Sequence, residues 1–367
     1  MPVLEANGDG GYVVRLRYME NYPVRSYFAK YGADAYFDTA RRPERIERGG
    51  QIYRPGDALW PAAKYAFRCS LFVHVGALQH LCGLHFTTSN MAARAQFCLG
   101  PDHPIRRLLK PFTFGAVSIN YEATIGLSNP NAILYRATSL MREAVQKALD
   151  DTLNSLSYEQ GGFACVGHEL RRRAASGLRT PWDEDLADYW EVLLAFVRDY
   201  LALYWPDSAA LAADNGARTF WDALREAAYY YHVPPRATSD TEASEQLHEM
   251  LAHLIATVTG MHTHMGGLAE YTRNPECAVA KWMDGEECAR PQWAAQTRSL
   301  IAFVGQPMVS ILSAWDCVFL DEKARDAARK FRAALEAMGE RIDARNAARP
   351  IPFRSFHPQC MDTSIAV

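Results

Sequence analysis

The chain has 367 residues, enough for one large domain or two modest ones with a buried core. Its residues are 49% hydrophobic and 22% charged, and the formal net charge of −3 gives no reason to expect a nucleic-acid partner. The eight cysteines are scattered and form no Cys-x-x-Cys pair, so we expect free thiols in a reducing compartment rather than a disulfide framework.

The N-terminal residues do not have the pattern of a secretory signal, because they lack a basic segment followed by an apolar one. No apolar run in the sequence is long enough to span a bilayer. We therefore expect a soluble, cytoplasmic protein with no transmembrane segment.

The predicted elements are mostly helices. Residues 1–58 alternate short apolar runs with Gly, Pro and Arg, which indicates irregular structure with a few short strands. From residue 59 to residue 86 apolar side chains recur at helical spacing, and Pro61 suits the first turn of that helix. A second helix is predicted within 87–110, ended by Gly100-Pro101 and a short turn into residues 103–111. A loop-rich segment is expected over 156–184, and further helices over 184–205, 244–265, 296–312 and 321–346. The pattern predicts a mainly α, single-domain fold over 1–367, with its helical core in 59–367.

Two histidines, His80 and His85, lie five positions apart near the end of the first long helix. On an α-helix five residues turn through roughly 500°, which would point the two rings about 140° apart. A π-bulge around Cys82 and Gly83 would bring both rings to nearly the same face, and such bulges occur mostly at functional sites. The spacing alone leaves open whether these are unrelated histidines or a metal pair on an irregular helix.

A third histidine, His262, occupies the next core-facing position of the apolar stripe that runs through residues 244–265. A single histidine in such a stripe is more often a core residue than a ligand. Three histidines on core helices favour a metal site, because imidazole suits Fe, Zn and Cu, but they name no reaction.

Two other metal patterns fail on their spacing. His248 and His253 resemble a zinc-protease pair, but they are five positions apart instead of four. Glu245 and His248 form a single Glu-x-x-His unit, whereas di-iron helix bundles need two. The sequence also contains no Gly-rich phosphate loop and no Gly-x-Ser-x-Gly elbow.

Several segments, taken in order over roughly residues 50–367, are similar to the lipoxygenase family. Residues 80–85 resemble the first iron-histidine pair of that family, and His262 falls where its second iron helix belongs. The other matching segments are 60–66 (WPAAKYA), 102–111 (DHPIRRLLKP), 118–129 (SINYEATIGLSN), 190–205 (WEVLLAFVRDYLALYW) and 363–367 (TSIAV). The chain resembles a short, bacterial-type form with the catalytic domain only, without the N-terminal β-barrel lipid-binding domain.

The resemblance implies a non-heme iron centre, with manganese as an alternative ion. Its ligands would be His80, His85, His262 and the terminal carboxylate of Val367. An α-carboxyl group has a pKa near ~3.5 in model peptides, so it is an anion at neutral pH and a plausible hard ligand for iron.

The sequence departs from the family pattern at Gly266, at Pro130, and at Thr124, where the family often has Arg. Gly266 stands where the family usually has Asn, His or Ser as a further ligand, so water fills that position or His264 replaces it; we favour water. Pro130 falls where the family has the small residue that directs oxygen access. Pro130 and Gly266 are therefore the expected pocket and oxygen-access residues.

The resemblance implies an oxidoreductase, a dioxygenase that uses O2. It would remove a hydrogen atom from a polyunsaturated fatty acid and insert O2 to give a hydroperoxide. A shortened channel would instead suit a smaller, non-lipid substrate in a specialised biosynthetic pathway. A third possibility is a non-catalytic metal-binding protein on the same scaffold.

Overall fold

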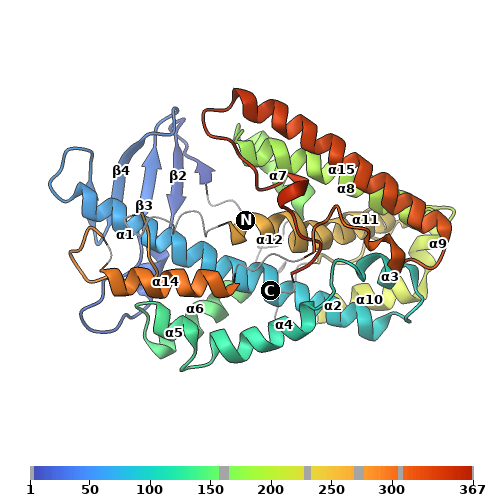
Figure 1. Ribbon diagram of the computed structural model, residues 1–367, viewed down its shortest axis with the longest axis horizontal. Coiled ribbons are helices and arrows are strands. Elements are labelled where there is room, and N and C mark those ends of the chain that lie inside the picture. Colours follow the sequence, from blue (N-terminus) through green and yellow to red (C-terminus); the bar gives the residue numbers. More distant parts are fainter. Residues whose placement is uncertain are drawn as a thin grey trace.

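The computed structural model of the protein describes residues 4–156, 165–226, 233–267, 277–288, 290–304 and 309–365. Most of these residues are helical and one small sheet lies at one end of the molecule, which confirms the predicted fold class (Figure 1). No helix within the described ranges is both long enough and apolar enough to cross a membrane.

The N-terminal part is more regular than the sequence suggests, because its strands form one five-stranded antiparallel sheet in chain order. The register places Val14, Ala35 and Ile46 in one row across neighbouring strands, and all three side chains are buried. This row follows from the two-residue period of a strand, which turns alternate side chains to the core. The strands are β1 (Leu4–Ala6), β2 (Tyr12–Arg15), β3 (Asp34–Phe37), β4 (Pro43–Arg48) and β5 (Gln51–Tyr53).

One uninterrupted helical stretch runs through the middle of the molecule (Figure 1). It comprises α1 (Trp60–Val73), the π-helical segment η2 (His74–Phe86) and α2 (Thr87–Cys98). Pro61 lies in the first turn of α1, where its missing N–H group costs no helical hydrogen bond. The predicted second helix does not start separately at residue 87, because it continues the first helix, but it ends before Gly100 and Pro101 as expected, and the chain then turns into α3 (Pro104–Leu109).

The helices α8 (Pro181–Leu201) and α15 (Glu322–Ala348) pack lengthwise against each other (Figure 1). Thr180 and Asp183 form a capping box that fixes the start of α8. The rings of Phe196 and Phe331 stack 4.4 Å apart between the two helices. The fully buried Asp185 of α8 accepts hydrogen bonds from Arg345 and Arg349, at 2.9 and 2.8 Å.

The remaining helices pack around the long stretch α1–η2–α2 and around the pair α8 and α15. One of them, α7 (Val166–Ala175), lies in the segment 156–184 that was expected to be loop-rich. The others are η1 (Arg17–Asn21), α4 (Ala116–Ala123), η3 (Thr124–Ser128), α5 (Ile133–Ala137), α6 (Arg142–Ser155), α9 (Ser208–Ala213), α10 (Asn215–Glu226), α11 (Asp240–Ala256), η4 (Thr257–Met261), α12 (His262–Gly266), α14 (Pro291–Val304), η5 (Trp315–Val318) and η6 (Pro358–Cys360).

Two hydrophobic clusters make up the core, and η2 contributes to both. Leu84 belongs to the cluster formed mainly by α8, α11 and α15, whereas Leu78 and Leu81 belong to the cluster that joins the sheet to α1 and α6. The histidines of η2 therefore lie where the two clusters meet.

Candidate metal centre

The π-helical segment η2 brings His80 and His85 together. Their ring centroids lie 4.9 Å apart, although an α-helix would point the rings in different directions. The expected helix irregularity around Cys82 and Gly83 is therefore confirmed, and it extends over the whole of His74–Phe86. The hydroxyl of Thr87 donates to the carbonyl of Cys82 at 3.0 Å and so satisfies one acceptor of the irregular turn.

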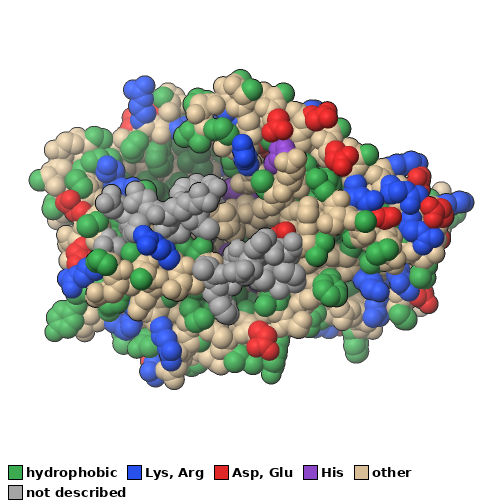
Figure 2. Space-filling view, viewed as in Figure 1, with side chains coloured by type: hydrophobic (Ala, Val, Ile, Leu, Met, Phe, Trp, Pro, Cys, Tyr) green, Lys and Arg blue, Asp and Glu red, His purple; other side chains and the backbone are tan. Residues whose placement is uncertain are grey.

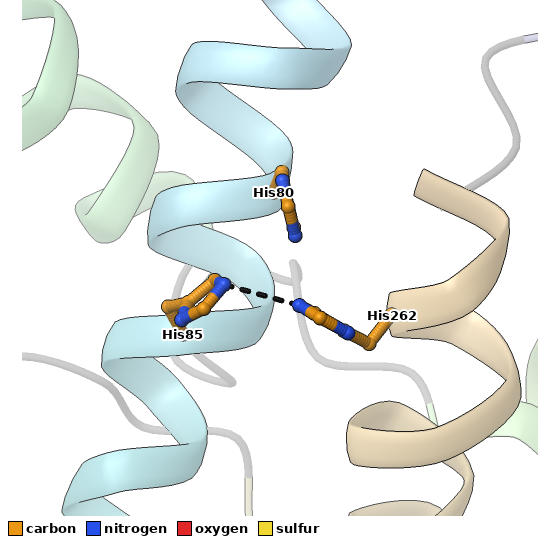
Figure 3. Close-up of side chains that lie close together, drawn as sticks. All are labelled: His80, His85 and His262. Carbon is orange, nitrogen blue, oxygen red and sulfur yellow. Dashed lines mark hydrogen bonds between the residues drawn. The ribbon is translucent and has the colours of Figure 1, made fainter. Parts of the chain in front are cut away.

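The third histidine approaches from the facing helix. His262 begins α12 directly after the second π-helical segment, η4. Its ring centroid lies 4.8 Å from that of His80 and 5.0 Å from that of His85. Figure 3 shows the three rings turned toward one another, two from one helix and one from the other. The ligand-capable nitrogens of this histidine triad lie within 4.8 Å of one another.

Burial keeps the histidine triad uncharged. His80, His85 and His262 are 5–6% exposed. Burial lowers the pKa of His80 to about 4 and holds the pKa values of His85 and His262 well below the ordinary value. At neutral pH all three rings therefore have a nitrogen lone pair available for a metal ion.

The free lone pairs of the triad fit a metal ion better than a closed hydrogen-bond network. His80 Nε2 is buried and has no hydrogen-bond partner among the described residues. The Nε2 atoms of His85 and His262 lie 3.2 Å apart and face each other (Figure 3). Buried polar atoms are normally paired, so an orphaned imidazole nitrogen beside two others is accounted for by a shared ion.

A buried asparagine on α4 orients His85. Asn120 donates from its side-chain amide to the carbonyl of Ala116 at 2.5 Å, which turns its oxygen toward Nδ1 of His85 at 3.1 Å. The proton of His85 is then held on Nδ1, and Nε2 is left free. Sequence reasoning did not single out Asn120, although the residue lies inside a segment, 118–129, that carries the family resemblance.

The C-terminal segment is held against the helix that carries His262. Met361 packs on Gly260 so closely that a Cβ at Gly260 would lie 3.1 Å from the Met361 sulfur. The backbone N–H of Thr363 donates a hydrogen bond to the carbonyl of Val309 at 2.8 Å, and Ile365 is fully buried. Val367 lies outside the described residues, so its role as a ligand stays a prediction.

His264, the possible substitute ligand, does not join the triad. Its Nδ1 lies 3.0 Å from the hydroxyl of Ser355, and its ring stacks on Phe356 at 5.9 Å. Gly266 does lie beside the site, because it lines the same cavity as His80 and His85. A Cβ at Gly266 would have no atom within 4 Å among its described surroundings.

An apolar cavity of about 430 Å³ extends from the histidines. Its walls include parts of α1, η2, α4, η3, α5, α12 and α14, and most of its lining side chains are hydrophobic. Figure 2 shows that one face of the molecule is hollowed, with hydrophobic side chains in the wall of the hollow. A long apolar ligand would be held there with one end near His80 and His85.

Pro130 does not have the position expected of an oxygen-access residue. It is exposed in the turn after η3 and is not among the described residues that line the cavity. Two small residues of the same segment, Ala123 and Gly126, line the cavity instead. The role of Pro130 in oxygen access therefore gains no support from its position and stays a prediction.

A second group of metal-capable side chains, Cys165, His168 and Glu249, is explained by its own contacts. The thiol of Cys165 lies 3.5 Å from one oxygen of Glu249, and Arg171 pairs with the other at 3.4 Å. The side chain of His168 is 60% exposed. A carboxylate that already has a guanidinium partner and a thiol donor does not require a cation.

The fold and the histidine triad define a class, lipoxygenase-like helical proteins. Arachidonate 12-lipoxygenase, 12R-type, from Mus musculus is 22% identical over 346 residues, which cover 86% of this chain and 48% of the relative. A variant LOX solved in complex with arachidonate superposes with a TM-score of 0.84 at 16% identity, covering 98% of this chain and 60% of that one. The manganese lipoxygenase of Gaeumannomyces graminis superposes with a TM-score of 0.78 at 17% identity, covering 97% and 70%.

The chain therefore resembles lipoxygenases in sequence over most of its length and has their fold, which confirms the resemblance that its sequence segments indicate. No protein-family model matches it. It spans about half the length of the curated relatives that it matches.

Proposed function

We propose that the protein is a metal-dependent dioxygenase that inserts O2 into a polyunsaturated fatty-acyl chain to give a hydroperoxide. The observation that carries the proposal is the convergence of His80, His85 and His262 beside an apolar cavity that His80 and His85 line. The similarity to a LOX bound to arachidonate supports the substrate class. Iron is the expected ion, and the similarity to a manganese lipoxygenase keeps manganese as the alternative.

The ion would supply one-electron redox chemistry that removes a hydrogen atom from a weak C–H bond, so that the substrate radical takes up O2. The triad would hold this ion together with the predicted carboxylate of Val367. Asn120 would keep Nε2 of His85 directed at the ion through its hydrogen bond to Nδ1. The open space at Gly266 favours water over a side chain at the position where relatives have a further ligand.

The rest of the chain would bind and shield the substrate. The apolar walls of the cavity would hold an extended acyl chain and exclude water from the reacting carbon. Leu81 from η2 and Met265 from α12 line the cavity next to the histidines. These side chains carry no O–H or S–H group from which the substrate radical could take a hydrogen atom.

The proposal is tested by measuring metal content and oxygen uptake with both linoleate and methyl linoleate on the same purified protein. We expect about one iron or manganese ion per chain, with oxygen uptake and the ultraviolet absorbance of a conjugated diene. His262→Ala should lose both, and His168→Ala, an exposed histidine outside the cavity, should keep both. Bound iron without lipid turnover would contradict the fatty-acyl substrate and favour a smaller, non-lipid one. A metal-free, inactive protein would favour a non-catalytic role.

A further inference from the structure

The described lining of the cavity carries negative charge at one residue and no positive charge. Among the described lining residues, Glu122 is the one side chain that carries a formal charge at neutral pH. The other hydrogen-bonding groups are already neutral or engaged: the histidines are uncharged, and the hydroxyl of Thr138 donates to the carbonyl of Leu134 at 2.7 Å. No Lys or Arg side chain lines the cavity within the described ranges.

Glu122 lies at the open end of the cavity. It belongs to α4 and is exposed, as are Ile125 and Gly126 of the adjoining η3, whereas His80 and His85 at the other end are buried. A long ligand with its reacting carbons at the histidines would therefore place one of its ends next to the Glu122 carboxylate.

No positively charged side chain among the described residues pairs with the Glu122 carboxylate. The carboxylate has no ion pair within 4.0 Å among the described residues. The lysine nearest in sequence to the cavity lining, Lys281, directs its ammonium elsewhere. Its Nζ donates to the carbonyl of Arg136 at 2.7 Å and lies 4.3 Å from the ring centroid of Trp293.

We propose that Glu122 makes the cavity select an acyl chain whose head group is uncharged, as in an ester or amide, over the free fatty acid. This inference rests on the proposed function, since it assumes that the cavity binds an acyl chain. A free carboxylate is an anion at neutral pH, and it would be brought beside a second anion at the edge of an apolar, weakly screening wall. An ester or amide head group avoids this repulsion and keeps the same apolar contacts. Glu122 thus acts as a repulsive element that sets specificity.

The test compares the binding of oleate and methyl oleate to the metal-loaded protein by calorimetry below their aggregation concentrations. Oleate and its ester differ only in the head group. We expect the ester to bind about tenfold more tightly than the acid. Glu122→Gln should raise the affinity for oleate about tenfold and change that for methyl oleate by less than about twofold. Glu143→Gln, which removes an exposed carboxylate at the start of α6, should leave the ratio unchanged.

Two results would overturn the role of Glu122. One is equal or tighter binding of oleate by the unmodified protein, and the other is an ester-to-acid ratio that Glu122→Gln does not change. The proposed function is judged separately from oxygen uptake with methyl linoleate. Ester-selective binding without oxygen uptake would support the Glu122 selectivity and contradict the dioxygenase. Equal oxygen uptake with linoleate and its ester would support the dioxygenase and contradict the Glu122 selectivity.

Discussion

At the scale of single residues, the histidine triad depends on keeping three imidazoles neutral inside the protein. Burial lowers their pKa values, and the hydrogen bond from His85 Nδ1 to Asn120 decides which nitrogen of that ring is free. Two histidines, His262 and His264, are only two positions apart, yet they face different surroundings. The identity of the ligands is therefore decided by the direction of each side chain from α12.

Replacing each of these two histidines separates a ligand role from a packing role. His262→Ala should reduce bound metal to background, because it removes one of three imidazoles. His264→Ala should keep the metal and cost about 1 kcal/mol of stability, from its lost hydrogen bond to Ser355 and its lost ring stacking. Metal analysis and urea unfolding of both variants measure these effects. Retained metal in His262→Ala with lost metal in His264→Ala would show that the wrong histidine has been assigned.

Asn120 provides a test of the orientation of His85. Asn120→Ala should weaken metal affinity by about 10- to 100-fold, which is the usual effect of removing a group that orients a metal-binding histidine. Asn131→Ala removes an exposed asparagine from the turn before α5 and serves as the control. Competition with a chelator measures the affinity. Equal affinities for the two variants would mean that the Asn120 contact does not position the ligand.

At the scale of elements, both helices that carry the triad are irregular at the site. The segment η2 is π-helical through His80 and His85, and η4 is π-helical immediately before His262. The hydroxyl of Thr259 in η4 donates to the carbonyl of Ile255 at 2.6 Å and accepts a 2.6 Å hydrogen bond from the hydroxyl of Tyr189 in α8. Such contacts hold a backbone form that is rare elsewhere and concentrated at functional sites.

The close packing at Gly260 predicts a loss of stability on adding one methyl group. A Cβ at Gly260 would lie 2.8 Å from the Phe356 ring, so Gly260→Ala should destabilise the protein by about 1–3 kcal/mol, although Ala is the better helix former. The same change at Gly266 meets no atom within 4 Å among the described residues and should be neutral or stabilising. Chemical unfolding of both variants checks the contrast, and an equal stability change would contradict it.

At the scale of the whole molecule, a neutral buried histidine makes stability depend on pH. Burial lowers the pKa of His253 in α11 from 6.5 to about 4. Below pH 6.5 the unfolded chain therefore binds a proton that the folded chain does not bind. The resulting stability is complete above pH 6.5 and is lost as the pH falls from 6.5 toward 4.

His253→Gln isolates the contribution of His253 to the pH dependence of stability, because every other titratable group is present in both proteins and cancels in the comparison. Between pH 6.5 and pH 4 the metal-free parent should lose about 1 kcal/mol more stability per pH unit than His253→Gln. Urea unfolding at pH 7 and pH 5, in the presence of a chelator, measures the difference. Identical pH slopes for the two proteins would contradict a depressed pKa at His253.

The sequence predicted those parts of the structure that follow from local patterns. Apolar periodicity placed the main helices, and the five-residue step from His80 to His85 predicted the π-helical turn. The approach of His262 to this pair followed from the family resemblance, since no local pattern relates residues so far apart. Which small residue of 118–130 lies at the cavity could not be predicted, because the segment contains a π-helical turn and its side-chain directions cannot be counted from a regular helix. Asn120 was missed because its partner, His85, lies 35 positions away.

The central claim is that the three histidines bind one redox-active metal ion. An anomalous difference map from crystals of the purified protein, recorded at the iron and manganese absorption edges, tests it directly. We predict a single peak among the Nε2 atoms of His80, His85 and His262. The absence of a peak there, or a peak at another place such as Cys165, His168 and Glu249, would contradict the claim.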